Sequence, residues 1–508
     1  MTWRGTCLGV VVVLLLASTM SAQQGLTAVD AWVTSHQREL VTRLAEFVAI
    51  PSVRGNTDAL RQQATVVREA LSTRGFDAAL IETPAAPLVF AERRTPGATR
   101  TLMLYFHYDG QPVDPARWRQ PTPFTPVLRT GRLDAVGVRD LPLGDQTRFE
   151  DDWRLFGRAS ADAKAPIVAF LAAIDAMQAS ALTPTWNLKV LIDGDEETNS
   201  AGLKSVAGAN RQRFAADLLL MMDGPAHPTG RPTLVFGARG SVGFELTVFG
   251  PKDELHSGHY GNWIANPAIR LARLLASMKD DTGRVLIAGF YDGIAPLTAD
   301  ERALLRAVPD DPDALLTLFG VAAPEANAES LQEAYTRPSL NIRGIASGHV
   351  GAAATNVIPS TAVASLDMRL VTETRGAAML ERVRAHIRAQ GFYLLDRDPT
   401  DAERARNKDI VKLTTASPTE AYRVSVTTAQ SKMVIDGLTR ALGQPPVVLR
   451  SSGATVPVAE LADAAGAPAV SVQTVNFDDS QHTDNENMRL GHMFSSVKTI
   501  AALLTLGR

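Results

Sequence analysis

The feature that most constrains the fold of this chain is an alternation of short apolar runs with helical segments, which stops after Pro232 and returns near residue 431. An alternation of strand and helix is typical of an α/β layer. The predicted helices cover residues 30–50, 60–74 and 165–177, and the predicted strands residues 79–81, 88–91, 101–106, 187–192 and 217–222. We therefore expect a mostly parallel sheet flanked by helices.

The interval between these two parts has a different pattern. Residues 244–248 alternate polar and apolar side chains as half-buried antiparallel strands do. A chain of 508 residues is also too long for one hydrophobic core. We expect one α/β domain split into residues 23–231 and 416–508, interrupted by an α+β insert at 232–415. Whether residues 280–335 shape a substrate pocket or a subunit contact stays open.

The first 22 residues have the pattern of a signal peptide. Arg4 precedes an apolar run at 8–17, and small residues lead to Ala22, where we expect cleavage. A membrane anchor is the alternative, but this run is shorter than the roughly 20 residues that span a bilayer. We therefore expect an exported protein, periplasmic or extracellular, with no stable membrane anchor.

Composition narrows the chemistry that the chain can perform. Cys7 is the only cysteine and lies in the leader, so any metal must bind through His, Asp and Glu. The formal net charge is -3 and no basic stripe is interleaved with aromatic residues, which disfavours nucleic acid as a partner.

Four local clusters of histidines and carboxylates lie at predicted strand ends or in loops, where ligands of open α/β sheets bind. Taken singly, they are weak evidence for a site, and a core histidine with an acid, a helix cap, a solvated acidic turn and a surface histidine explain them better. Together they supply the two histidines and three carboxylates of a dinuclear metal site that activates water. These clusters contain His107 and Asp109, Asp162, Glu196 and Glu197, and Asp223 with His482.

The motifs that contain these residues resemble those of the dinuclear zinc peptidase and deacylase family. That family includes carnosinases, non-specific dipeptidases, glutamate carboxypeptidases, aminoacylases and succinyl-diaminopimelate desuccinylase. The resemblance runs from about residue 30 to the C-terminus and is greatest to the carnosinase and dipeptidase branch. The matching motifs are His107-x-Asp109 with Gln111-Pro112-Val113, Gly157-Arg158 through Asp162-x-Lys164, Glu196-Glu197, Asp223 and His482-x-x-Asn485-Glu486.

The resemblance implies a role for each of these side chains. Asp162 would bridge two divalent metal ions, with His107 and Asp223 completing one coordination sphere and Glu197 and His482 the other. Asp109 would orient His107, and Glu196 would be the general base. Zinc is the metal expected, although Mn²⁺ and Co²⁺ accept the same donors.

The insert carries further resemblances, which imply a lid and dimerisation domain and a homodimer. The segment Leu255-His256-Ser257-Gly258 resembles the lid motif whose histidine stabilises the oxyanion. Asn356 and Arg369 resemble the segment that holds the substrate carboxylate, and Gly453 lies in a sequence resembling the loop that lines the substrate pocket. Arg369 on a strand could equally be a surface charge.

The chain also departs from the family pattern. Ala159 and Ala165 stand where glycines are usual, so the loop around Asp162 is expected to differ slightly. No histidine lies between Leu395 and Ser431, where the carnosinase-like enzymes have one that binds substrate. This absence leaves dipeptide specificity less well supported than hydrolysis.

These observations predict a metal-dependent exopeptidase, a dipeptidase or carboxypeptidase acting on a small peptide. An N-acyl-amino-acid amidohydrolase resembling aminoacylase is the nearest alternative, and a non-catalytic binding protein with the same fold is another. A serine hydrolase is disfavoured because no Gly-x-Ser-x-Gly elbow lies between a strand and a helix.

Overall fold

The computed structural model describes residues 6–325 and 327–507, with side chains from Gln24 onward. The signal peptide predicted at 1–22 therefore lies outside the residues whose side chains are described. Within the described part of the chain, no helix combines the length and the apolar character needed to cross a membrane. The chain forms two compact units: residues 1–236, 424–449 and 457–508, and residues 237–423 and 450–456.

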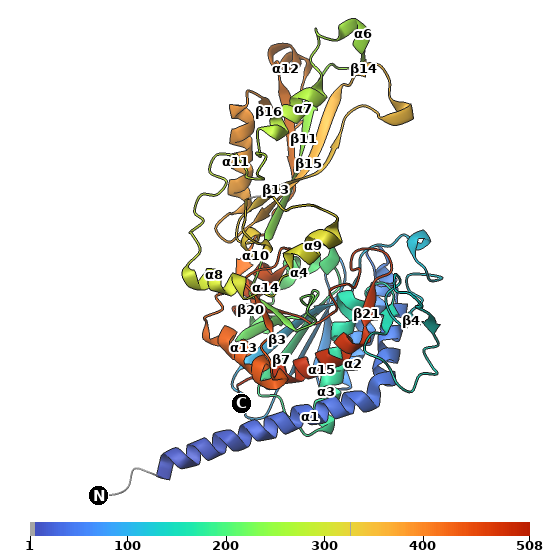
Figure 1. Ribbon diagram of the computed structural model, residues 1–508, viewed down its shortest axis with the longest axis vertical. Helices are drawn as coiled ribbons and strands as arrows, with labels where there is room; N and C mark the ends of the chain where they lie inside the picture. The colour runs from blue at the N-terminus through green and yellow to red at the C-terminus, as the bar shows by residue number, and fades with distance from the viewer. Residues whose placement is uncertain (1–5, 326, 508) are drawn as a thin grey trace, which may run out of the picture. The chain divides into compact units, whose positions relative to one another are not determined.

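The first unit is built on an eight-stranded sheet, which confirms the predicted α/β layer. The four central strands β7, β3, β8 and β20 run parallel to one another, and β1 and β2 continue the sheet antiparallel at one edge. In order across the sheet the strands are β1 (Asp77–Ile81), β2 (Leu88–Arg93), β7 (Asn187–Asp193), β3 (Thr101–His107), β8 (Leu218–Met221), β20 (Ala469–Gln473), β9 (Thr233–Val235) and β19 (Val447–Leu449). Figure 1 shows the first and last parts of the chain, blue and red, interleaved in this unit.

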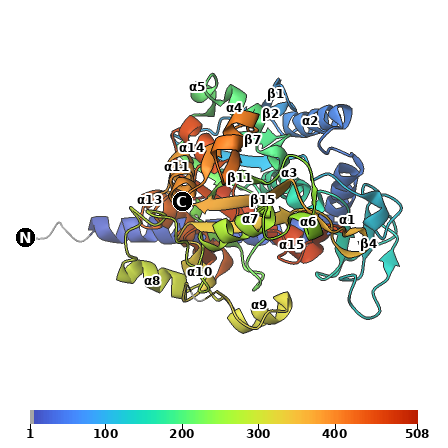
Figure 2. The ribbon, with the colours of Figure 1, turned by 90° about the horizontal axis from the view of Figure 1, so that it is seen from above.

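Helices cover both faces of this sheet. Helix α3 (Ala165–Ala179) is apolar nearly all round and packs between α1 (Thr6–Ala49), α15 (Leu490–Leu504) and the sheet, so nearly all its side chains are buried. On the other face, α14 (Val458–Ala465) contacts β8, α4 (Ala201–Ala207) and α5 (Arg211–Phe214). The remaining helices are α2 (Thr57–Ser72), which lies beside β1 and β2 in Figure 2, and α13 (Ala429–Leu442), which packs on α15.

A small antiparallel sheet brings distant segments of the first unit together. Its strands are β21 (Asn487–Arg489), β6 (Arg154–Phe156), β4 (Val127–Arg129) and β5 (Asp140–Leu141), in that order. Because β6 pairs with β21, the loop after β6 lies beside the loop before β21. Those two loops contain Asp162 and His482.

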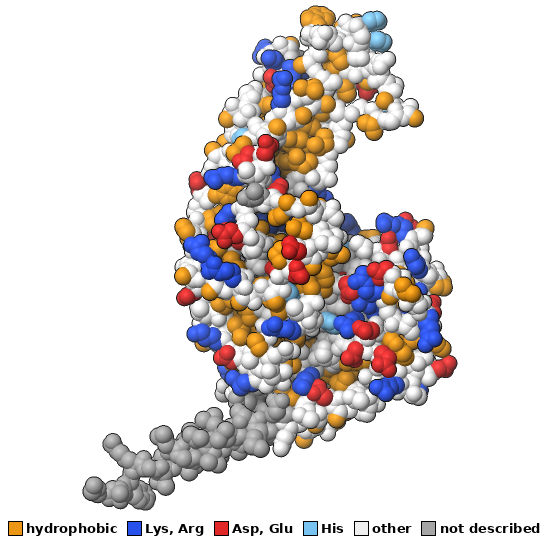
Figure 3. Space-filling model, viewed as in Figure 1, with side chains coloured by type: hydrophobic (Ala, Val, Ile, Leu, Met, Phe, Trp, Pro, Cys, Tyr) orange, Lys and Arg blue, Asp and Glu red, His pale blue; other side chains and the backbone are white. Residues whose placement is uncertain are grey.

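The second unit has a five-stranded sheet with helices on one face. Its order is β13 (Ser339–Ala346), β15 (Thr361–Leu370), β11 (Gly240–Phe249), β17 (Ile410–Thr415) and β16 (Tyr393–Leu395), antiparallel except for the last pair. Side chains of β15 alternate between buried and half-exposed, and the buried set packs against α7 (Pro267–Ala276) and α11 (Gly376–Ala389). Figure 3 shows hydrophobic side chains on the surface over α7 and β15.

Short elements complete the second unit. Strands β12 (Leu255–His256) and β14 (Val357–Ile358) pair with each other, as do β10 (Gly237–Ala238) and β18 (Tyr422–Arg423). The segment left open at 280–335 contains α8 (Ala299–Arg306), α9 (Pro312–Phe319) and α10 (Leu331–Ala334).

The bounds of the second unit lie a few residues beyond 232 and 415. Strand β9 pairs with β19 and β20 of the large sheet, and therefore belongs to the first unit. Residues 450–456 belong to the second unit because Ser452 donates its backbone N–H to Gly237, and Arg239 donates its own to Ala454.

Candidate metal centre

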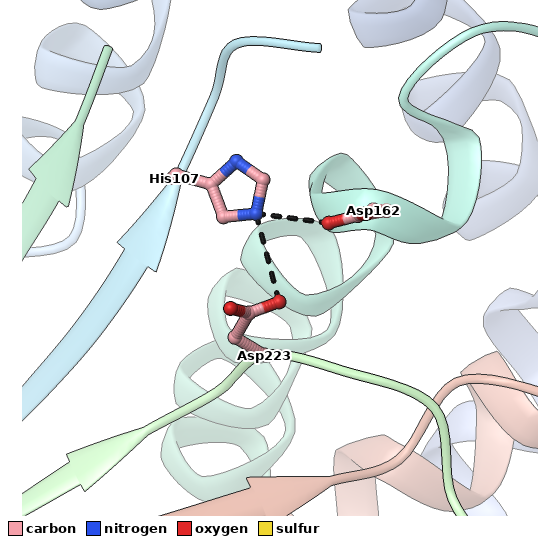
Figure 4. Close-up of side chains that lie close together, drawn as sticks. All are labelled: His107, Asp162 and Asp223. Atoms are coloured by element: carbon pink, nitrogen blue, oxygen red, sulfur yellow. Dashed lines mark hydrogen bonds and ion pairs between the residues drawn. The ribbon is translucent and has the colours of Figure 1, made fainter. Parts of the chain in front are cut away.

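The carboxyl ends of three parallel strands bring the first group of predicted ligands together. His107 is the last residue of β3, Asp223 follows β8 by two residues, and Glu196 and Glu197 follow β7. Parallel neighbours end at the same edge of a sheet, so these side chains converge there. Figure 4 shows His107 and Asp223 from these strand ends pointing toward Asp162, which comes from the bend before α3.

Four side chains gather around Asp162 in two groups. His107 Nε2 lies 3.0 Å from Asp162 Oδ1 and 3.6 Å from Asp223 Oδ1. His482 Nε2 lies 3.2 Å from Asp162 Oδ2 and 3.2 Å from Glu197 Oε2. Within each group one ligand atom per residue lies within 4.8 Å of the others, and Asp162 belongs to both groups.

The electrostatics of this arrangement fit a pair of divalent cations. Burial raises the pKa of Glu196 well above its usual range, and the negative charges of Asp223 and Glu197 act in the same direction. Hydrogen bonds to Asp162 and Glu197 raise the pKa of His482 to about 11, so a proton on the imidazole occupies the place that a cation can take. Nitrogen and oxygen donors in two groups with one shared carboxylate are the donor set of a dinuclear site.

Asp109 supports both sides of this centre. Its Oδ1 lies 3.3 Å from His107 Nδ1, on the side of the ring that faces away from Asp162. Its carboxylate also accepts the backbone N–H groups of Glu196, at 3.2 Å, and Glu197, at 3.1 Å. One buried carboxylate therefore orients the imidazole and fixes the turn that carries the two glutamates.

The Glu196 carboxylate has no bonded partner among the described hydrogen bonds and ion pairs, whereas Glu197 accepts a bond of 2.8 Å from Gln111 Nε2. Glu196 is thus the acid of the pair whose oxygens remain free to exchange a proton.

Glu486 holds the two loops of the centre together, a role that sequence reasoning did not assign. Its fully buried carboxylate accepts bonds from Arg158 Nη1 and the backbone N–H of Ala159, both at 2.8 Å, and from those of Ala161 and Asp162, both at 3.0 Å. The only signal in the sequence was its place in the motif after His482.

The structure shows why glycine is usual at position 159. Ala159 adopts φ 61°, a left-handed conformation that favours glycine, and in it donates its N–H to Glu486. Lys164 from the same motif is buried, and its Nζ donates to the carbonyl oxygens of Phe47 and Ile50 at 2.8 Å each. This lysine therefore attaches the loop to the end of α1.

The remaining predicted residues lie in the second unit, in two separate places. His256 pairs with Val357 across β12 and β14, and Ser257 donates its N–H to Asn356, so exposed His256 and Asn356 are neighbours. Arg369 lies near the other end of β15, where its Nη1 donates to Thr455 Oγ1 at 2.9 Å.

Gly453 belongs to the same loop as Thr455, and its α-carbon packs against the ring of Tyr335. The second unit therefore brings Arg369 and the Gly453 loop together but leaves His256 and Asn356 at the far end of the strand.

Comparisons with known proteins agree with this geometry. The family model of the M20 peptidase dimerisation domain matches residues 236–392. The human Beta-Ala-His dipeptidase is 25% identical over 499 residues, which cover 94% of this chain and 92% of that protein. The Cys-Gly metallodipeptidase of Candida albicans is 28% identical over 373 residues, covering 69% of this chain and 73% of that protein.

Among solved structures, an M20 family metallo-carboxypeptidase from Sulfolobus solfataricus is similar over 92% of this chain and 99% of its own. The TM-score is 0.76 and the sequence identity 28%.

Proposed function

This chain is similar to M20 peptidases along nearly its whole length, and from that premise we propose that it is a metal-dependent exopeptidase that hydrolyses dipeptides with a free C-terminal carboxylate. The observation that carries the proposal is Asp162, whose two oxygens face two separate histidines, each with a further carboxylate. An N-acyl amino acid, the other substrate class considered, gains no support from the relatives.

We propose two zinc ions as the resident metals. His107, Asp162 and Asp223 would hold one, and Asp162, Glu197 and His482 the other. Bound there, such ions acidify water and polarise the scissile carbonyl.

Glu196 supplies the proton transfers in this proposal. Its carboxylate takes a proton from the attacking water, whose oxygen forms the new bond to the peptide carbonyl carbon. The same carboxyl group then returns the proton to the amide nitrogen as the C–N bond breaks, which releases an amine and a carboxylate. The raised pKa of Glu196 suits a group that must both accept and donate.

Substrate binding and oligomeric state are linked in this proposal. Arg369 would hold the C-terminal carboxylate through its guanidinium, with Thr455 fixing that side chain. The ten residues of β15 span roughly 30 Å, so the His256 and Asn356 of one molecule cannot hold the same dipeptide as its Arg369. We propose a homodimer in which a second copy supplies His256 as oxyanion donor and Asn356 as a substrate contact.

We also propose that the protein is exported to the periplasm or the extracellular space, on the strength of the leader pattern at residues 1–22. Gly453 would line the substrate pocket, since its loop carries Thr455 beside Arg369.

The test is metal-dependent turnover with a substrate panel. Chelated protein should be inactive, and added Zn²⁺, Mn²⁺ or Co²⁺ should restore cleavage of dipeptides but not of matched N-acetyl amino acids. Equal or faster release of the acetyl group would instead favour the aminoacylase-like alternative. Activity that survives chelation, with no metal detected in the protein, would contradict the dinuclear mechanism.

A further inference from the structure

A buried arginine next to Arg369 has no acidic partner in the part of the chain that the structure describes. Arg239 is only 7% exposed, and its Nη2 donates to two neutral acceptors, Arg337 O at 2.9 Å and Ser339 Oγ at 2.8 Å. Its Nε is buried and bonded to nothing, and among the described residues no carboxylate oxygen forms an ion pair with it. A guanidinium withdrawn from water is costly unless an anion faces it.

Arg239 and Arg369 lie on the same face of the five-stranded sheet. Ser241 of β11 and Ser339 of β13 are the register partners of Arg369 on its two sides. Arg239 precedes Ser241 by two residues, and its side chain donates to Ser339. It therefore lies beside the row formed by Ser241, Arg369 and Ser339. Burial, and then the positive charge of Arg369, lower the pKa of Arg239 to about 10, which reflects two cations held close together.

Among the described residues, the acid paired with Arg369 is Asp367. Asp367 Oδ2 lies 3.5 Å from Arg369 Nε, and Asp367 also accepts a bond of 3.1 Å from Asn341. This carboxylate is therefore already engaged by Arg369 and Asn341, and no ion pair joins it to Arg239 among the described residues.

Arg239 also lines a cavity of about 710 Å³, large enough for an amino-acid side chain. Of the two acids in its wall, Glu325 is paired with Lys279 at 2.6 Å and Glu333 with Arg337. Arg284 and Arg302, both exposed, add positive charge to the wall. Tyr335 closes it where its ring packs on Gly453, in the loop that carries Thr455.

We propose that Arg239 is a specificity-determining residue that binds a second carboxylate, so that the enzyme prefers dipeptides with an acidic C-terminal residue. Arg369 holds the main-chain carboxylate, and Arg239 holds the side-chain carboxylate of Asp or Glu at the mouth of the cavity. This inference rests on the proposed function and names the substrate class within it. It also assigns part of the segment at 280–335 to the substrate pocket.

The experiment compares Ala-Glu with Ala-Gln, which differ in charge but hardly in shape, on the metal-loaded enzyme. The wild type should have a kcat/KM at least about tenfold higher for Ala-Glu, as expected for a charge-assisted bond. Arg239→Met should bring the ratio to within about threefold of one, and Arg239→Lys should keep part of the preference. Arg388→Met, an exposed arginine on α11, should leave the ratio unchanged.

Equal kcat/KM for the two dipeptides in the wild type would overturn the inference. So would an Arg239→Met enzyme in which both values fall by the same factor, because that is the behaviour of a purely structural residue. Calorimetric binding of free glutamate against free glutamine tests the subsite without turnover. If the protein cleaves no dipeptide yet binds free glutamate at least tenfold more tightly than free glutamine, the subsite stands and the proposed function fails.

Discussion

At the scale of single residues, the centre depends on carboxylates that each serve two partners. Asp162 faces His107 and His482 with different oxygens. Asp109 contacts the imidazole ring of His107 and the turn that carries Glu196 and Glu197, and Glu486 binds the two loops of the centre. Removing one such side chain disturbs more than one ligand at once. Glu196 is the exception, because its carboxylate has no bonded partner among the described residues, and it can therefore be changed without disturbing the rest.

Glu196→Gln should lower kcat by on the order of 10²–10⁴-fold, because an amide cannot accept the proton of the attacking water. Metal content should stay at the wild-type value, since Glu196 is outside both ligand groups. Steady-state kinetics together with elemental analysis of the purified variant measure both quantities. Glu46→Gln, a change at an exposed glutamate, is the control, and a variant at residue 196 with wild-type kcat would rule out the assigned base.

Glu486→Ala should lower the free energy of unfolding by about 3–5 kcal/mol, because it leaves the buried Arg158 guanidinium and three backbone N–H groups without their acceptor. Urea unfolding of metal-free protein measures the change. Arg117→Ala breaks the ion pair between the exposed Arg117 and the half-buried Asp484 and should cost no more than about 1 kcal/mol. A similar loss in the free energy of unfolding for the two variants would contradict the role given to Glu486.

The sequence identified residues by local motif and missed those that act through distant contacts. His107, Glu197 and Asp223 could be found because each follows an apolar strand, and the carboxyl ends of strands meet. Glu486 lies more than 300 residues from the backbone groups that it binds, and Arg239 stands out only because its burial leaves it without an acid. Neither property leaves a periodic or spacing signal in the chain.

At the scale of elements, the pairing of β6 with β21 fixes the distance between the Asp162 and His482 loops. Buried Arg154 on β6 reinforces it by donating to both carboxylate oxygens of Asp478, at 2.9 and 2.8 Å, and to Asn487 Oδ1 at 2.8 Å. The sequence predicted the long elements, such as the strand at 187–192 observed at Asn187–Asp193. It did not predict this small sheet, because strands of two or three residues are too short to show a period of two.

The Arg154–Asp478 pair predicts a dependence of stability on pH. Burial opposes ionisation of Asp478, but its hydrogen bonds and ion pair with Arg154 outweigh this and lower its pKa to about 2. A carboxyl whose pKa is depressed by folding stabilises the protein above its unfolded pKa of about 3.9, and that contribution is lost as the pH falls toward 2.

Asp478→Asn should therefore cost about 1–2 kcal/mol at pH 6, and the difference from wild type should shrink by pH 2.5. Urea unfolding of metal-free protein at the two pH values measures it. Asp145→Asn, at an exposed carboxylate with no ion pair among the described residues, should show no such change. A cost for Asp478→Asn that is the same at both pH values would show that the pair does not titrate as described.

At the scale of the whole molecule, the second unit offers a surface suited to a second copy. Strand β13 is an edge strand whose outer residues are largely exposed, including Ile345 at 61%. Exposed edges with apolar side chains pair readily with other chains. The family resemblance implied this dimer from sequence, but the edge position of β13 depends on strand order, which no single segment encodes.

Ile345→Arg should convert the proposed dimer to a monomer, because it places a charge on that edge. Activity should fall with dimer content, since each centre would lose the His256 of its partner, while the monomer's melting temperature should stay within a few degrees of the wild-type value. Light scattering after gel filtration, with kcat/KM on the same fractions, measures this. Leu318→Arg, at another exposed apolar position on α9, should leave the mass unchanged. A dimer that persists in Ile345→Arg would place the interface elsewhere.

The position of β20 in the large sheet has a consequence for how the protein is made. This strand lies between β8 and β9, yet it is formed by residues 469–473, and α15, which packs against α3, follows it. A nascent chain stopped anywhere before residue 469 would lack one of the four parallel strands at the middle of the sheet. The first unit therefore completes its fold only after the ribosome has synthesised residues 469–473 and α15, and chains that stop earlier would leave the apolar strand β8 open to aggregation and proteolysis.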